Sequence, residues 1–255
     1  MSPQATAPKA LQMPIPFLAP DDNLTAFPSV ETALDEPNGL LMAGGSLTPA
    51  RLLSAYRNGI FPWYEEGEPI LWWSPDPRCI LWPEDFRLSR SLRKSMRNAG
   101  FTVTQNSAFR DVMISCGAPR SGSSGTWVTR EMIEAYCRLH MHDIAESIEV
   151  WRGDVLVGGL YGVVIGQVFI GESMFSRERD ASKIALAHLV GSGRFKLIDC
   201  QLETPHLRSL GAQTVSRAEY ITLLDRYAQT TIDGVAADRA VDQGIPQHFQ
   251  RAANR

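Results

Sequence analysis

The sequence predicts an α+β protein in which a small N-terminal domain packs on a larger domain built around a mixed, mostly antiparallel sheet. Apolar residues recur at helical spacing in some segments and at alternating positions in others. Three strand-like segments follow one another almost without a break between residues 147 and 173, and such short turns require antiparallel pairing. The stretch before residue 80 is rich in proline and aromatic residues and has few regular elements, which is typical of a small companion domain.

Composition limits the class of protein. With 255 residues, of which 44% are hydrophobic, the chain can bury a large core. The net charge of -3 means that binding to nucleic acid would need a local basic patch. Neither a signal peptide nor a membrane-spanning stretch is evident, so we expect a cytoplasmic protein with no membrane partner. The four cysteines form no CxxC pair and the histidines no ligand spacing, so we expect no metal.

The regular elements are expected in a defined order. Residues 1–25 should be loose or disordered, 26–80 should form the small N-terminal domain, 81–229 the larger domain, and 230–255 a loosely packed or disordered tail. In the small domain, Thr48 caps a helix that has Pro49 in its first turn and Gly59 just past its end. In the larger domain we expect helices over 89–98, 108–116, 130–142 and 181–190, strands over 101–104, 147–151, 155–163, 167–173 and 195–202, and helices starting near 204 and 216.

This order matches the N-acyltransferase (GNAT) fold, a similarity of fold that does not define function. Coenzyme A-dependent enzymes of that fold bind a pyrophosphate on a glycine-rich turn of bare backbone N–H groups after the three-stranded meander. Here the segment from Met174 to Lys183 contains no glycine. The acyl group is therefore expected to come from a carrier other than coenzyme A.

A basic helix follows a tryptophan-rich stretch that contains Trp63, Trp72, Trp73 and Trp82. Residues 87–97 carry five basic side chains and no acidic one. Tryptophan faces can stack on bases and cations attract phosphates, so an RNA ligand is indicated, although an ordinary solvated helix face would look similar. The predicted outer stripe is Arg90, Arg93, Lys94 and Arg97, with Leu88, Leu92 and Met96 packing inward.

Two segments carry candidate chemistry. Period-two alternation in the strand 197–201 places Asp199 and Gln201 on one face and Cys200 on the other. A carboxylate in an apolar strand is costly to bury, so the pair suggests a site, with structural hydrogen bonding as the alternative. Cys200 faces away from Asp199 and has no nearby histidine in sequence, which disfavours a nucleophilic role. Glu172 ends the third meander strand beside Phe169; it is either solvated or placed to hold an amine next to an apolar side chain.

Together these segments resemble the leucyl/phenylalanyl-tRNA–protein transferase family over about residues 26–227. The runs that carry the resemblance are FPSVETALDEPNGLLMAGG (27–45), GIFPWYEEGEPILWWSPDPR (59–78), GTWVTREMIEAY (125–136), SIEVW (147–151), GGLYGV (158–163), GESMFS (171–176) and LIDCQ (197–201). The resemblance implies a monomeric enzyme without a cofactor that moves leucine, phenylalanine or, less well, methionine from aminoacyl-tRNA to proteins with N-terminal arginine or lysine. The product would be a degradation signal of the N-end rule pathway.

The resemblance also implies roles for single residues. It places Asp199 and Gln201 at the reacting centre with Glu172 nearby. Around the adenosine and the acceptor it places Tyr56, Trp63, Trp127 and Tyr136, and around the aminoacyl side chain it places Leu160, Phe169 and Met174. Ser173 is also expected to bind substrate. After Lys183 the chain is three residues shorter than the family pattern, and residues 187–189 replace expected aromatic residues, so the depth of the side-chain pocket is left open.

Two other functions remain to be compared with this one. A coenzyme A-dependent N-acetyltransferase would have the same fold but needs the glycine turn that is missing here. A non-catalytic tRNA-binding protein would use the tryptophans as stacking platforms, but it would not require Asp199 and Gln201 together. The Asp199 and Gln201 pair therefore separates an enzyme from a binding protein.

Overall fold

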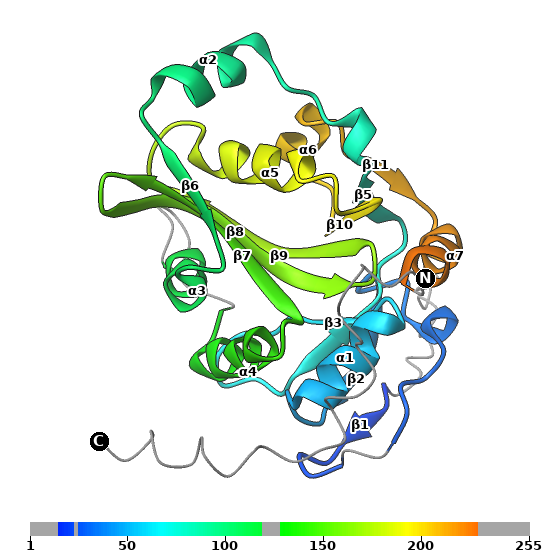
Figure 1. Ribbon diagram of the computed structural model, residues 1–255. Helices are drawn as coiled ribbons and strands as arrows, with labels where there is room; N and C mark the ends of the chain where they lie inside the picture. The colour runs from blue at the N-terminus through cyan, green and yellow to red at the C-terminus, as the bar shows by residue number, and fades with distance from the viewer. Residues whose placement is uncertain (1–14, 23–24, 119–127, 229–255) are drawn as a thin grey trace, which may run out of the picture.

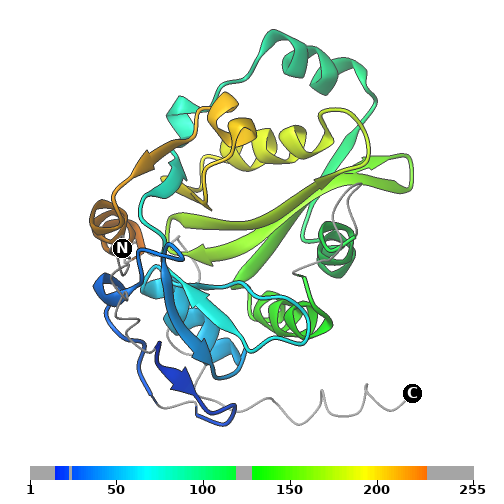
Figure 2. The ribbon, with the colours of Figure 1, turned by 180° about the vertical axis from the view of Figure 1, so that it is seen from behind.

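The computed structural model describes residues 15–22, 25–118 and 128–228. It contains a large seven-stranded sheet and a smaller four-stranded sheet in the N-terminal part of the chain (Figure 1). Helices cover both faces of the large sheet: α2, α5 and α6 lie on one side, and α1, α3 and α4 on the other (Figures 1 and 2). The architecture confirms the predicted α+β class and the GNAT-like order of elements.

The large sheet has the strand order β11-β5-β10-β9-β8-β7-β6. Only the β9–β10 pair is parallel and every other pair is antiparallel, as expected for a meander followed by one crossover through a helix. The strands are β5 (Arg78–Leu81), β6 (Thr102–Gln105), β7 (Ala145–Arg152), β8 (Val155–Ile165), β9 (Val168–Ser176), β10 (Leu197–Gln201) and β11 (Gln213–Val215). The prediction missed β5 and β11, which are only four and three residues long.

Two apolar cores lie on the two faces of this sheet. One contains Leu160, Phe169 and Leu186 on the α5 face, and the other contains Val112 and Tyr136 on the α3 and α4 face. The helices are α2 (Arg90–Asn98), α3 (Phe109–Cys116), α4 (Arg130–Met141), α5 (Ala181–Gly191), α6 (Pro205–Ser209) and α7 (Arg217–Ala228). All six were expected to within a few residues, because their caps and their apolar spacing are local signals.

The N-terminal part packs on the second of these cores. Its sheet has the order β1-β2-β4-β3 and is covered by α1. The Thr48 side chain accepts a hydrogen bond from the backbone N–H of Arg51, which is the predicted N-cap. The elements are β1 (Phe17–Leu18), β2 (Leu40–Gly44), α1 (Pro49–Arg57), β3 (Phe61–Pro62) and β4 (Leu71–Trp73), with short 3-10 helices at Val30–Thr32 and Pro83–Asp85.

Three expectations need correction. Residues 1–25 were expected to be loose, but Phe17–Leu18 pairs in parallel with β2 and Leu18 is buried. The boundary expected at residue 80 falls inside β5, a strand of the large sheet, and one apolar core runs from Trp72 into that sheet. On α2, Leu92 is buried as expected, whereas Met96 is 39% exposed because the helix lies at the rim of the molecule.

Close packing between β8 and α5 gives a prediction for stability. A Cβ atom at Gly158 would lie 2.4 Å from the Cβ of Ala181, so Gly158→Ala should push α5 away from the sheet and lower the free energy of unfolding by about 1–3 kcal/mol. Gly191, at the end of α5, has no atom within 4 Å of such a Cβ, so Gly191→Ala should leave stability unchanged or raise it by up to about 1 kcal/mol. Urea unfolding of both variants tests this, and equal effects would contradict it.

Candidate active site

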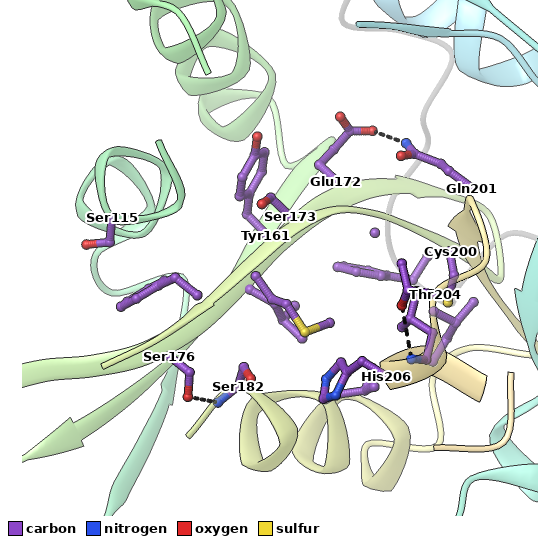
Figure 3. Close-up of a pocket in the computed structure, with 18 of the residues that line it drawn as sticks. Ser115, Tyr161, Glu172, Ser173, Ser176, Ser182, Cys200, Gln201, Thr204 and His206 are labelled. Atoms are coloured by element: carbon purple, nitrogen blue, oxygen red, sulfur yellow. Dashed lines mark hydrogen bonds between the residues drawn. The ribbon is translucent and has the colours of Figure 1, made fainter. Parts of the chain in front are cut away.

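The candidate site lies where β9 and β10 separate. Their parallel pairing covers only three residue pairs and ends at Asp199 opposite Ile170. Beyond that point a cavity of about 790 Å³ passes between the two strands (Figure 3). Its lining comes from both faces of the sheet, with Tyr161 from the α3 and α4 face and Leu160 from the α5 face. A gap within the sheet thus connects a polar compartment with an apolar one.

Two strand irregularities aim the polar side chains at this gap. On β9, Ser173 pairs with Tyr161 and Gly171 pairs with Gly162, which leaves Glu172 as an extra residue in a bulge. On β10, the register against β5 shifts between Asp199 and Gln201, and Gln201 has a left-handed backbone with φ of 61°. The amide Nε2 of Gln201 then donates to Glu172 Oε1 at 2.9 Å (Figure 3).

Glu172 is the centre of a buried cluster of hydrogen bonds. The Tyr56 hydroxyl donates to Oε1 at 2.7 Å and the Tyr136 hydroxyl donates to Oε2 at 3.1 Å. The hydroxyls of Tyr56 and Tyr136 also contact each other. Glu172 is only 7% exposed, and no lysine or arginine in the described part of the chain forms a salt bridge with it. The cluster therefore holds a buried carboxyl group that has no basic partner among the described residues.

Burial raises the pKa of Glu172 to about 7, although the hydrogen bonds from Tyr56, Tyr136 and Gln201 act in the opposite direction. The negative charge of Asp199 adds to the increase. Burial likewise raises the pKa of Tyr56 and Tyr136 well above the ordinary range, so both phenols stay protonated near neutral pH. Glu172 is thus a carboxyl group that changes its charge close to physiological pH.

Asp199 is fully buried and lies behind the cavity, not in it. It is absent from the cavity lining, which includes its neighbours Ile198 and Cys200. Arg78 binds it through two nitrogens at 2.9 and 2.6 Å, and Tyr220 donates to it at 2.7 Å. The backbone N–H of Gln201 donates to Asp199 Oδ1 at 2.8 Å. Asp199 and Gln201 are therefore in contact through the backbone of Gln201, and their joint role in catalysis stays a prediction.

The apolar compartment contains all the side-chain-pocket residues that the resemblance implied. Leu160, Phe169 and Met174 line the cavity, and Ser173 lines its polar side. Residues that we had not singled out complete the apolar wall: Leu186 of α5, Ile198 of β10 and Leu207 of α6.

Cys200 also lines the cavity. A hydrogen bond with Cys79, and then burial, raise the pKa of the Cys200 thiol well above its ordinary value. A thiol that stays protonated is a poor nucleophile, in agreement with the sequence analysis.

The aromatic residues expected around an adenosine are distributed differently. Tyr56 and Tyr136 are buried against Glu172 and do not line the cavity. Trp63 is 42% exposed, with its ring centroid 5.7 Å from that of Trp73, so its predicted contact with the adenosine stays a prediction. Trp127 lies outside the described residues.

Sequence reasoning missed Arg78 and Tyr220. Arg78 ends a run that we had noted only for its family resemblance, and Tyr220 lies on a helix that we had recognised only by its cap. Both side chains reach Asp199 through tertiary packing, so no local pattern in the chain could have indicated them.

The start of α5 differs from a phosphate-binding turn. The backbone N–H of Ser182 donates to Ser176 Oγ at 3.2 Å, and that of Ala181 donates to the Glu178 carbonyl. Glu178 is paired with Arg152, and Asp180 with Arg179 and Lys183. Backbone amides that already have hydrogen-bond partners are not free to bind a pyrophosphate.

The basic stripe on α2 faces outward as expected. Arg90, Arg93, Lys94 and Arg97 are exposed, and none forms a salt bridge with another described residue. Ser95 Oγ donates to Asp180 Oδ2 at 2.8 Å, which ties α2 to the start of α5. The stripe is therefore free to contact an anionic partner.

Within residues 15–22, 25–118 and 128–228, no group of three or more His, Cys, Asp or Glu side chains is arranged to hold a metal ion. No helix there is long and apolar enough to span a bilayer.

Fold and site together describe an α+β protein of N-acyltransferase type that has a buried carboxyl–amide pair where its sheet divides. Comparison with known sequences makes this more specific. A sequence model of the leucyl/phenylalanyl-tRNA protein transferase family matches residues 80–225, and a model of the N-terminal domain of that family matches residues 45–76. The chain therefore belongs to the leucyl/phenylalanyl-tRNA–protein transferase family, a family of aminoacyltransferases.

Several relatives share most of their length with this chain. The leucyl/phenylalanyl-tRNA–protein transferase of Chromohalobacter salexigens is 57% identical over 210 residues, or 81% of this chain and 82% of that protein. The enzyme of Thiobacillus denitrificans is 57% identical over 80% of this chain and 91% of its own length, and that of Methylococcus capsulatus is 52% identical over 85% and 94%. A GCN5-related N-acetyltransferase from Kribbella flavida gives a TM-score of 0.33 at 11% identity, over 66% of this chain and 61% of that one.

The raised pKa of Glu172 predicts a pH dependence of stability. Its value of about 7 in the folded protein, against an ordinary 4.5, means that the folded state binds the proton more tightly than the unfolded state does. The contribution of the protonated Glu172 to the free energy of unfolding is complete below pH 4.5 and is lost as the pH rises through 7. The stability of the wild type relative to Glu172→Gln should therefore fall by on the order of 3 kcal/mol across that range. Urea unfolding of both proteins from pH 4.5 to 8.5 measures this difference in the free energy of unfolding. Glu66→Gln, at an exposed position, serves as control. A difference between wild type and Glu172→Gln that does not change with pH would contradict the prediction.

Proposed function

We propose that this enzyme transfers leucine or phenylalanine, and less well methionine, from aminoacyl-tRNA to the α-amine of proteins that begin with arginine or lysine. The observation that carries this proposal is the buried Glu172 carboxyl group, which has no basic partner among the described residues and lies beside an apolar compartment. A substrate that joins an ammonium group to an apolar side chain would satisfy both features. The relatives are named leucyl/phenylalanyl-tRNA–protein transferases, and we therefore take aminoacyl-tRNA as the carrier of the transferred amino acid.

The apolar compartment suits the aminoacyl side chain. Leu160, Phe169 and Met174 form a wall on which an aliphatic or aromatic side chain can be buried. The ammonium group that neutralises Glu172 would come either from the aminoacyl group or from the acceptor, whose arginine or lysine side chain is also a cation. Both possibilities use the same attraction between a buried carboxylate and a cation.

Gln201 is suited to hold the attacking amine. Its Nε2 donates to Glu172, and a carboxylate can only accept, so the amide carbonyl oxygen of Gln201 is left to accept a hydrogen bond from an amine. The aminoacyl ester is already activated: the amine nitrogen bonds to the ester carbonyl carbon, the bond to the ribose oxygen breaks, and that oxygen takes the proton. An α-amine has a pKa of about 7.7–8.0, so neither a strong base nor a cofactor is required.

Asp199 contributes indirectly in this scheme. Its carboxylate is paired with Arg78 and receives the backbone N–H of Gln201, so it orients Gln201 and does not contact the reactants. Holding amine and ester together in this way can supply much of the rate.

The alternatives fit the site less well. A coenzyme A-dependent acetyltransferase would need free amides at the start of α5, where Ser176 and Glu178 already occupy two of them. A non-catalytic tRNA-binding protein would gain nothing from burying Glu172 and Gln201 together, which costs desolvation energy. In our proposal the stripe on α2 contacts the tRNA acceptor stem, the enzyme acts as a monomer in the cytoplasm, and its products enter N-end rule degradation.

A transfer assay tests the proposal directly. Purified protein is mixed with tRNA carrying labelled leucine and with a peptide that begins with arginine; label should enter the peptide, and a peptide that begins with alanine should receive far less. Gln201→Ala should lower the single-turnover rate by about 100-fold or more, because the attacking amine loses its partner. Binding of the tRNA without any transfer by the wild type would favour the non-catalytic alternative.

The salt dependence of binding tests the role of α2. Each phosphate contact contributes roughly 0.7–0.9 to the slope of log affinity against log salt. Replacing Arg90, Lys94 and Arg97 together by alanine should therefore lower the slope for tRNA by about 2–3. Arg226→Ala, at an exposed position of α7, should leave the slope unchanged. An unchanged slope in the triple variant would remove α2 from the RNA-binding surface.

A further inference from the structure

Arg78 is a buried arginine that contacts two separate parts of the site. It is 1% exposed, and its Nε and one terminal nitrogen bind the two oxygens of Asp199. Its other terminal nitrogen donates to the backbone carbonyl of Gly59 at 3.3 Å. The guanidinium also lies over the rings of Phe61 and Tyr220, at 4.8 and 4.5 Å from their centroids. One rigid cation is thus fixed by three different segments of the chain.

On one side, the ion pair supports the unusual backbone of Gln201. A non-glycine residue with φ near 60° is unfavourable unless its surroundings hold it. Asp199 Oδ1 accepts the Gln201 N–H, while Arg78 and Tyr220 hold the same carboxylate from the other directions. With Arg78 in place, the Gln201 side chain can point at Glu172.

On the other side, Arg78 contacts the turn that ends α1. Gly59 has φ of 73°, and its N–H donates to the carbonyl of Tyr56, the last-turn residue whose hydroxyl reaches Glu172. The hydroxyl of Tyr56 and the amide of Gln201 donate to the same oxygen, Glu172 Oε1. Two groups from distant parts of the chain must therefore be placed to within a fraction of an ångström of each other.

We propose that Arg78 is a positioning residue that couples the end of α1 to β10, so that Tyr56 and Gln201 converge on one oxygen of Glu172. Arg78 is the first residue of β5 in the large sheet, and its guanidinium reaches the carbonyl of Gly59 just past the end of α1. Its importance for the reaction rests on the proposed function, whereas its effect on Glu172 does not.

The first experiment measures Glu172 and needs no substrate. The stability difference between each protein and its Glu172→Gln counterpart, followed from pH 4.5 to 8.5, gives the apparent pKa of Glu172. Arg78→Lys keeps the positive charge but cannot bind Asp199 and Gly59 together. It should raise the pKa of Glu172 by at least about half a unit, because Tyr56 and Gln201, which donate to Glu172, are displaced. Tyr220→Phe, which removes one hydroxyl, should give a smaller rise and covers the case in which Arg78→Lys does not fold.

The control is Tyr227→Phe, on the same helix as Tyr220, which removes a hydroxyl for which the described residues show no contact with Asp199. It should leave the pKa of Glu172 unchanged. If Arg78→Lys and Tyr220→Phe also leave that pKa unchanged, Arg78 only supports the fold and the proposal is wrong.

The second experiment measures transfer. At saturating substrates, Arg78→Lys and Tyr220→Phe should lower kcat by about 10-fold while KM for leucyl-tRNA stays within about 2-fold, because positioning and not binding is lost. In a Gln201→Ala background Tyr220→Phe should have almost no further effect. The proposal would be overturned if Tyr220→Phe lowered kcat by the same factor with and without Gln201→Ala. It would also be overturned if Arg78→Lys and Tyr220→Phe both kept the full wild-type rate. No transfer by the wild type would instead overturn the proposed function, and the titration would still decide the role of Arg78.

Discussion

The short parallel pairing of β9 with β10 is the constraint on which the site depends. The two strands share three residue pairs and then diverge, so the sheet opens without losing its order. The cavity forms in that opening, with the apolar wall of Leu160 and Phe169 on one face and the Tyr161 hydroxyl and the Glu172 carboxyl group on the other. A reactant that must bury an apolar side chain and present a polar centre finds both environments within one continuous space.

Two carboxyl groups in this centre have opposite electrostatic surroundings. Asp199 is matched by the guanidinium of Arg78 and by two further donors, the Tyr220 hydroxyl and the backbone N–H of Gln201. Glu172 has three donors but no cation in the described part of the chain, and burial raises its pKa to about 7. Paired groups whose environments differ in this way commonly divide roles between positioning and chemistry.

The N-terminal part of the chain contributes directly to this centre. Tyr56 comes from α1, and Gly59 ends that helix at the guanidinium of Arg78. A single apolar core joins Trp72 of the small sheet to Val163 of the large one. The two parts therefore form one structural unit around Glu172, and a change in the packing of α1 would alter the surroundings of this carboxyl group.

The sequence by itself determined the order of elements, the helix caps, the antiparallel meander and the proximity of Asp199 to Gln201, because these depend on local spacing and on the period of the apolar pattern. It also indicated the missing phosphate turn and the outward stripe on α2. The bulges at Glu172 and Gln201, the short strands β5 and β11, and the contacts of Arg78 and Tyr220 were decided only by the tertiary structure. Each of these depends on partners far away in the chain: 121 positions separate Arg78 from Asp199, and no local pattern carries information over that distance.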